Sequence, residues 1–296
     1  MGMGMPFVSN LLFSFKHIKC YNIGMTLLIF IFVFLLGTII GSFLNVVIFR
    51  LNTGRTVVGG RSMCMNCSNH LSWYELIPVF SFLIQKGKCR NCQSSISHQY
   101  LLVEVITGLI FALIAFKFLP ILYFSYVLYV FYVVLFVFVF SLLIVISVYD
   151  LRHKIIPDKL VLIFIIISFL SVFISPFLFG SIFTLPTLTS LISGPILSLP
   201  FVILWYVSHG RLMGLGDGKL FLGVGWLLGL SQGIFAVILS FCLGSVVSLF
   251  VMFFYKNKKK INMKTEVPFA PFIIIATFIT FLFNFDFFSL IRLFSF

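Results

Sequence analysis

Long apolar stretches alternate with short polar loops along most of this chain. A transmembrane helix needs about 20 consecutive, largely apolar residues, and eight stretches approach that length. We predict spans near residues 25–48, 101–119, 121–149, 159–180, 188–208, 220–232, 233–255 and 271–292. The sixth is short and rich in glycine, which predicts a tilted, broken or shallow helix. The pattern predicts an all-α polytopic membrane protein with about eight transmembrane helices.

The composition supports a membrane protein and excludes two other classes. Of the 296 residues, 61% are apolar and only 9% are charged, whereas soluble domains have roughly 45–50% and about 25%. Disorder is excluded as well, because it requires few apolar residues together with a high net charge. Because a carboxylate is costly in a membrane, each acidic residue needs an explanation. There are seven: Glu75, Glu104, Asp150, Asp158, Asp217, Glu266 and Asp286.

Basic residues predict the orientation of the chain in the membrane. Segments 49–100, 150–159, 209–219 and 256–268 contain 16 of the 20 Lys and Arg residues. With eight spans, all four segments lie on the same side, and loops rich in Lys and Arg face the cytoplasm. The net charge of +13 therefore reflects membrane topology, and we expect the lipid bilayer, with no nucleic acid, as its partner.

The spans divide the chain into four parts. Residues 1–24 lack the charged start and the cleavage site of a secretory signal, so we expect either a short N-terminal extension or a translation start at Met25. The first transmembrane helix covers 25–48. Residues 49–100 form a cytoplasmic insert, and residues 101–296 contain the remaining spans.

Two Cys-x-x-Cys pairs lie in the polar insert. Cys64 and Cys67 form the first, Cys89 and Cys92 form the second, and 21 residues separate the pairs. This spacing predicts a tetrahedral zinc site in a small zinc-ribbon-like insert. Four cysteines leave no position for a reactive water, so the zinc is structural and supplies folding free energy. Two disulfides are the alternative, which the reducing cytoplasm disfavours.

Two aspartates are predicted at the same rim of the membrane. Asp150 ends the third span, and Asp217 follows Gly-Leu-Gly just before the sixth. A helical hairpin between them can return the chain to the same face and bring the carboxylates together. Two neighbouring carboxylates share one proton, which is the chemistry of an aspartic protease. The alternative is that each aspartate only caps a helix, which is the role expected for Asp158.

Glycines around Asp217 predict where a substrate lies. Glycine lets a backbone approach closely and permits turns with positive φ. We expect the substrate pocket to contain Gly214, Gly216, Gly218 and the acidic Glu104.

The ordered motifs resemble the bacterial type IV prepilin peptidases. These are bifunctional leader peptidase and N-methyltransferase enzymes of the GxGD membrane aspartic protease class. The resemblance runs from about residue 34 to 272. Besides the cysteine pairs and Gly-Leu-Gly-Asp, it includes Gly-Ser-Phe-Leu-Asn-Val-Val-Ile at 41–48, Leu-Ile-Pro at 76–78, Ile-Pro-Asp at 156–158 and Val-Pro-Phe-Ala-Pro-Phe at 267–272. In the last motif, Ala270 stands where the family usually has Gly.

The resemblance implies a specific activity. Asp150 and Asp217 are the catalytic aspartates of a peptidase domain over 101–296. This domain cleaves the basic leader of a prepilin or pseudopilin after a glycine, at the cytoplasmic face of the bacterial cell membrane. The new N-terminal residue, commonly Phe, is then methylated with S-adenosylmethionine. The sequence leaves the particular substrate open among pilus, secretion and competence pseudopilins.

The methyl-transfer site is less defined than the peptidase site. The insert lacks the Gly-rich strand–turn–helix of nucleotide-binding folds, so the residues do not locate the cofactor. Lys86-Gly87-Lys88-Cys89 resembles an Arg-Gly-Lys-Cys-like segment of the family. Gly87, Lys88 and Glu75 are therefore candidates for binding S-adenosylmethionine, and a turn within a zinc ribbon is the alternative.

A transporter is the main rival interpretation from another class. Its carboxylates would bind ions near the middle of the bilayer, whereas Asp150 and Asp217 are predicted at one rim. A transporter also gives the cysteine pairs no role other than regulation. A zinc-ribbon docking scaffold without catalysis is a third interpretation.

Overall fold

The computed structural model describes residues 23–54, 56, 60, 62–178, 186–255 and 267–287. Most of the predicted N-terminal extension and the lysines between 256 and 264 lie outside these residues, as does Glu266. The chain divides into two units, residues 1–141 and 142–296. The boundary falls within one long helix, α5, and each unit is described by itself.

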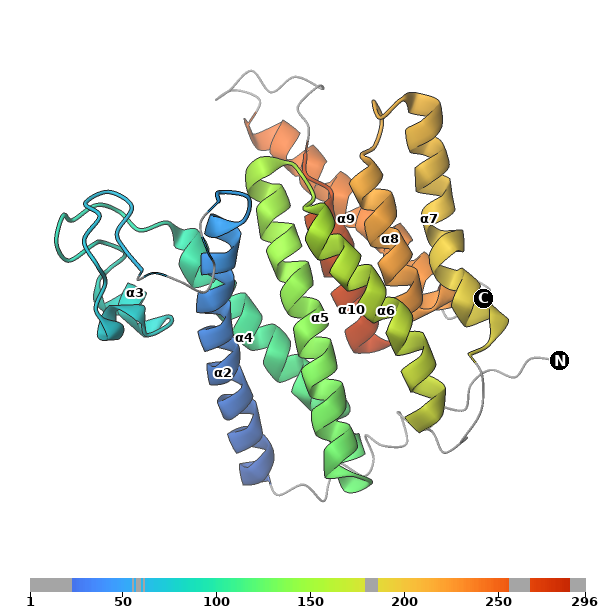
Figure 1. Ribbon diagram of the computed structural model, residues 1–296, viewed down its shortest axis with the longest axis horizontal. Helices are drawn as coiled ribbons and strands as arrows, with labels where there is room; N and C mark the ends of the chain where they lie inside the picture. The colour runs from blue at the N-terminus through green and yellow to red at the C-terminus, as the bar shows by residue number, and fades with distance from the viewer. Residues whose placement is uncertain are drawn as a thin grey trace. The chain divides into compact units, whose positions relative to one another are not determined.

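Eight long helices follow one another along the described residues (Figure 1). They are α2 (Ile23–Arg50), α4 (His98–Phe118), α5 (Tyr126–His153), α6 (Asp158–Leu178), α7 (Leu188–Ser208), α8 (Leu215–Leu228), α9 (Leu230–Tyr255) and α10 (Ala270–Phe283). Each corresponds in order to one predicted span. The all-α polytopic prediction is therefore confirmed.

Five of these helices are candidate membrane spans among the described residues. By length and composition, α2, α4, α5, α7 and α9 are long and apolar enough to cross a membrane. Of the other three, α8 and α10 have 14 residues each. The third, α6, ends next to segment 179–185, which lies outside the described residues.

The first unit is built on the close pair α2 and α4 (Figure 1). Small residues bring the two backbones together, because a Cβ added to Gly37 would lie 2.8 Å from Gly108 Cα. A Cβ on Gly41 would lie 2.8 Å from Glu104 Cα. The Gly-x-x-x-Gly of the first span thus serves helix packing, as small residues do in membranes. In the stretch of chain that connects α2 to α4, the insert forms two short helices, η2 (Trp73–Leu76) and α3 (Phe80–Ile84).

The second unit is organised around α8, which packs against α6, α7, α9 and α10. Its glycines explain that packing. A Cβ on Gly225 would lie 2.6 Å from the carbonyl oxygen of Ser193 in α7, and a Cβ on Gly223 would collide with Phe164 of α6. The Ser193 hydroxyl also donates a hydrogen bond to the Gly225 carbonyl at 2.8 Å. The glycine-rich sixth span is therefore short and is broken at Gly229, which has a φ of 79° and ends α8, whereas Gly223 and Gly225 serve close packing.

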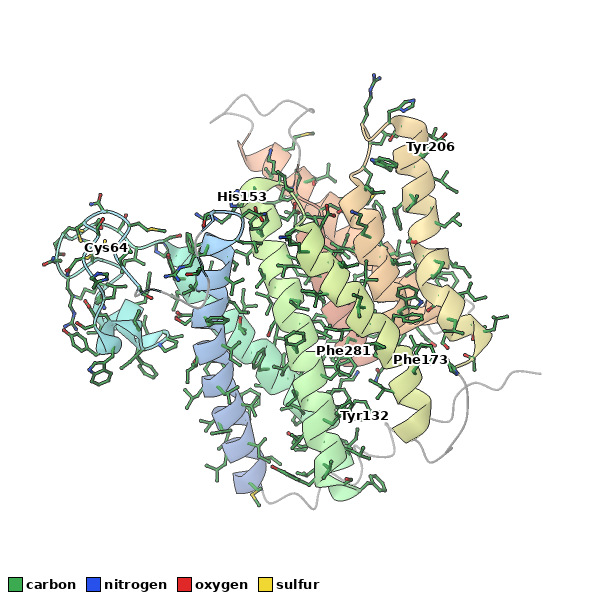
Figure 2. All side chains as sticks on the ribbon, viewed as in Figure 1. Cys64, Tyr132, His153, Phe173, Tyr206 and Phe281 are labelled. Carbon is green, nitrogen blue, oxygen red and sulfur yellow. The ribbon has the colours of Figure 1, made fainter. Side chains whose placement is uncertain are left out.

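Two helix boundaries differ from the predicted spans in ways that affect the site. The third span was predicted to end at 149, but α5 continues to His153, which Figure 2 labels at the end of that helix. The sixth was predicted from 220, but α8 begins at Leu215. Asp150 and Asp217 are therefore inside terminal helical turns, where backbone geometry fixes their side chains.

Candidate active site and metal centre

Asp150 lies in the last turn of α5 and is only 4% exposed. Its Oδ2 accepts a hydrogen bond from the backbone N–H of Ala270 at 3.3 Å. Ala270 is the first residue of α10, so the carboxylate faces a helix N-terminus, which favours negative charge. A hydrogen bond to an ionised acceptor is also stronger than one to a neutral acceptor. Both features stabilise the ionised form of Asp150 and oppose the cost of burying its charge.

Asp217 occupies the first turn of α8 and is 8% exposed. Its backbone N–H donates to the Gly214 carbonyl at 3.3 Å, which closes the turn. Asp217 lies outside the five candidate spans. Burial, and then electrostatic repulsion from Asp150, raise the pKa of Asp217 to about 7. The two aspartates therefore interact, and one carries its proton near neutral pH.

Such a pair can perform acid–base chemistry on one substrate. Two carboxyls that repel each other disfavour joint ionisation, so a pair of this kind can share one proton. The ionised member can remove a proton from water, and the protonated member can polarise a carbonyl. An interacting carboxyl pair with one pKa near 7 can offer an acid and a base near neutral pH.

The glycines around Asp217 allow close packing and leave space beside the carboxyl, and they do not form positive-φ turns. Gly214, Gly216 and Gly218 all lack positive φ, so the expectation of positive-φ turns was wrong. The reason is that the segment continues directly into α8. A Cβ on Gly216 would lie 2.9 Å from Ile156 Cδ1, which indicates close packing against the loop after Asp150. A Cβ on Gly214 would stand 3.6 Å from Asp217 Oδ2, so glycine leaves that side of the carboxyl open.

An ion pair joins the start of α6 to the start of α8. Lys219 Nζ lies 2.6 Å from Asp158 Oδ1. The side chains are 38% and 75% exposed, and exposed pairs contribute only about 0–1 kcal/mol. Asp158 also occupies the first turn of α6, where a carboxylate suits the helix N-terminus. Its role as a helix-end residue agrees with the prediction.

The two cysteine pairs sit on two equivalent turns. An isolated bridge between Met63 and His70 encloses the first pair, and one between Lys88 and Ser95 encloses the second. In each turn the first cysteine's N–H donates to the carbonyl five residues later, at 2.9 Å. The residue after each pair, Ser68 or Gln93, has positive φ. The insert therefore repeats one metal-binding turn twice.

The four thiols meet as a group. The Sγ atoms of Cys64, Cys67, Cys89 and Cys92 all lie within 4.8 Å of one another. Cys64 Sγ and Cys92 Sγ are 3.8 Å apart, close to the roughly 3.8 Å edge of a tetrahedron with 2.3 Å Zn–S bonds. Hydrogen bonds from the Ser94 hydroxyl and amide lower the pKa of Cys92 to about 6. The cluster, whose member Cys64 is labelled in Figure 2, fits a tetrahedral thiolate-bound ion.

Gly87, Lys88 and Glu75 have structural roles within the insert. Gly87 has a φ of 68°, and its carbonyl accepts from the Ile96 N–H at 2.7 Å. Lys88 takes part in the bridge to Ser95. Glu75 Oε2 accepts from the Ser72 N–H at 2.8 Å. These contacts support the turn interpretation, and their binding of S-adenosylmethionine stays a prediction.

Glu104 is buried in the first unit, and the structure gives it a partner that the sequence did not predict. Its Oε2 accepts a hydrogen bond from the Val79 N–H at 2.7 Å. Val79 has a φ of 63°, a strained conformation for a β-branched residue. Glu104 thus fastens the insert to α4. Asp150, Asp217 and the glycines around Asp217 lie in the second unit, so the residues of the predicted pocket are divided between the two units.

Comparison with known proteins decides the family. Residues 35–118 match the Bacterial Peptidase A24 N-terminal domain, and residues 137–249 match the Type IV leader peptidase family. A prepilin leader peptidase/N-methyltransferase of Vibrio cholerae is 31% identical over 269 residues, covering 83% of this chain and 94% of that protein. The chain belongs to the type IV leader peptidase family.

Two further relatives match the chain over different lengths. The Bacillus subtilis prepilin leader peptidase/N-methyltransferase is 29% identical over 254 residues, which cover 85% of this chain and 93% of that protein. That of Myxococcus xanthus is 48% identical over 81 residues, which is 27% of this chain and 24% of that protein. No solved structure matches the chain.

The two matched regions coincide with the two clusters of candidate residues. The N-terminal match contains the four cysteines and Glu104, and the leader peptidase match contains Asp150 and Asp217. The resemblance drawn from the sequence motifs is thereby confirmed, and so is the prediction of an enzyme of the type IV leader peptidase family. Ala270 lies beyond the second match, which makes its contact with Asp150 an observation of the structure alone.

Proposed function

We propose that the chain cleaves the basic leader of a type IV prepilin or pseudopilin after a glycine and then methylates the new N-terminal residue. The observation that carries this proposal is the electrostatic pairing of Asp150 with Asp217 in the unit matched to the leader peptidases. The names of the relatives supply the substrate class and the second activity.

The two aspartates take different roles in the proposed cleavage. Asp150, with an amide donor and a helix N-terminus on its carboxylate, is the base that removes a proton from water as the water attacks the peptide carbonyl. Asp217, whose pKa is about 7, donates a hydrogen bond from its protonated carboxyl to that carbonyl oxygen. The proton that Asp150 has taken from water then passes to the leaving amine when the C–N bond breaks.

In this proposal the site opens at the cytoplasmic face of the bacterial cell membrane. Asp150 lies three residues from the end of α5, at the start of the basic segment 150–159. Basic loops stay on the cytoplasmic side, and this supports an active site that opens there. A prepilin with a basic leader and an apolar helix would present its cleavage site at this depth.

The proposed organisation assigns one task to each of two segments of the chain. Residues 101–296 form the peptidase domain, and residues 49–100 form a zinc-stabilised insert in the methyl-transfer region. Four thiolates around one Zn²⁺ hold the two equivalent turns together, because the ion supplies folding energy to a small segment with little core. S-adenosylmethionine supplies the methyl group, and Gly87, Lys88 and Glu75 remain its candidate contacts.

Mass spectrometry of a processed substrate tests both activities. The purified chain in lipid vesicles is mixed with a prepilin-like substrate that has a basic leader, a glycine, a phenylalanine and an apolar helix. We expect cleavage after the glycine without cofactor, and one added methyl group when S-adenosylmethionine is present. An intact substrate would contradict the peptidase, and cleavage without any methylation would contradict the second activity alone.

A further inference from the structure

The insert exposes an apolar face outside the candidate membrane spans. Its members come from η2, α3 and the turn between them: Trp73, Leu76, Ile77, Phe80, Leu83 and Ile84. Trp73 is 78% exposed, Ile84 70% and Leu83 59%. Exposed apolar residues are ordinary on a transmembrane helix, but a contiguous group on a polar insert marks an interaction surface.

A hydrogen bond fixes where this apolar face lies relative to α4. Val79, in the middle of the face, donates its N–H to Glu104 at 2.7 Å. Glu104 is six residues after the first residue of α4, which is about 9 Å along the helix. Because α4 is one of the candidate spans, the apolar face lies at the level where a membrane-spanning helix leaves the bilayer.

The residues around the face suit a lipid surface. Lys86, Lys88 and Arg90 follow α3 directly, and basic residues next to a membrane attract anionic lipid headgroups. Tyr74 follows Trp73 in the chain, and the Arg90 guanidinium lies 5.0 Å from the centre of the Tyr74 ring. Trp and Tyr concentrate at the boundary between headgroups and acyl chains. Apolar, aromatic and basic groups therefore occur together as they do in interfacial anchors.

We propose that the apolar face inserts into the headgroup–acyl boundary of the leaflet on its own side of the membrane. The face then anchors the insert to the bilayer, with the basic residues against anionic headgroups. Glu104 holds the anchor at its depth through the Val79 turn. This proposal concerns the lipid contact alone and stands apart from the catalytic assignment.

Fluorescence of Trp73 tests the anchor directly. The chain has three tryptophans, so the Trp73 signal is the difference between the wild type and the W73F variant. Both are reconstituted in vesicles of phosphatidylcholine and phosphatidylglycerol that contain lipids brominated near the headgroup. We expect these lipids to quench Trp73 emission strongly, and aqueous acrylamide to quench it weakly. Strong acrylamide quenching without lipid quenching would overturn the proposal.

Two variants separate anchoring from folding. The triple variant F80S/L83S/I84S should lose lipid quenching of Trp73 while it keeps its bound zinc. The control M65S removes another exposed apolar side chain, 69% exposed on the first cysteine turn, and should keep both. If Trp73 is shielded from both quenchers and the shielding disappears when protein is diluted in lipid, a protein covers the face and the proposal fails.

Discussion

The Ala270 amide and the Asp150 carboxylate, 120 residues apart in sequence, are joined by a hydrogen bond of 3.3 Å. Replacing Ala270 with proline removes this donor at the first position of α10, where helices accept proline. We expect cleavage to fall about 10- to 100-fold, since a hydrogen bond to a charged group contributes about 1.5–3 kcal/mol.

Ala270→Gly is the matched control for that substitution, because it keeps the N–H. We expect it to cleave at close to the wild-type rate. Initial rates are compared after circular dichroism has verified equal helix content in the three proteins. Equal rates for the proline and glycine variants would show that the amide has no role at Asp150.

The pKa of Asp217 predicts a pH dependence of cleavage. The protonated carboxyl of Asp217 is the required form, and its pKa is about 7. Activity should therefore be lost as pH rises through that value and Asp217 loses its proton. The measurement is the pH profile of kcat at saturating substrate. A rate that stays constant well above this pH would contradict the assignment of Asp217 as the acid.

The same coupling can be observed without turnover. Because repulsion from Asp150 contributes to the raised pKa, Asp150→Asn should lower the pKa of Asp217. The chain has only four aspartates, so carbon-13 labelling of their carboxyls allows each titration to be followed by NMR. An Asp217 titration that does not change in the variant would mean that the two carboxyls are independent.

The cysteine cluster predicts a metal content. We expect about one zinc ion per chain, and its loss in Cys64→Ser or Cys92→Ser, because a closed site needs all four thiolates. Cys242→Ser, in α9, is the control and should keep the ion. Metal analysis by mass spectrometry of the purified variants decides the question. Full zinc content after loss of Cys92 would exclude the four-thiolate site.

Glu104 predicts a mechanical link between the insert and α4. Glu104→Ala leaves the Val79 N–H without its acceptor, which costs about 1–3 kcal/mol for a buried group. Glu104→Gln keeps an acceptor oxygen and should behave much more like the wild type. Trypsin cleavage after Lys86, Lys88 and Arg90 measures the release of the insert. Equal cleavage rates in the alanine variant and the wild type would argue against the link.

Local patterns predicted the helices and the thiol cluster well. Runs of about 20 apolar residues dictate helices in a membrane, because a buried backbone must pair its own polar groups. The Cys-x-x-Cys spacing is likewise local, so the thiol cluster followed from sequence. Asp150 and Asp217 were recognisable because the chain has so few other carboxylates.

Contacts between distant segments were beyond such patterns. The Ala270 donor is a backbone group, so no side chain in the sequence signals it. The same holds for Val79, whose N–H rather than its side chain holds Glu104. The glycines of α8 predicted a tilted, broken or shallow helix, but Gly223 and Gly225 allow α6 and α7 to pack closely against α8. Tertiary packing decides these features.

Cleavage by aspartate variants tests the central claim most directly. Asp150→Asn and Asp217→Asn preserve shape while they remove the acid–base function, and Asp158→Asn is the control on an exposed carboxylate. With a prepilin-like substrate in vesicles, the first two should each lower the cleavage rate by roughly 10²–10⁴-fold, and the control should cleave like the wild type. Undiminished cleavage by either the Asp150 or the Asp217 variant would contradict the aspartate pair.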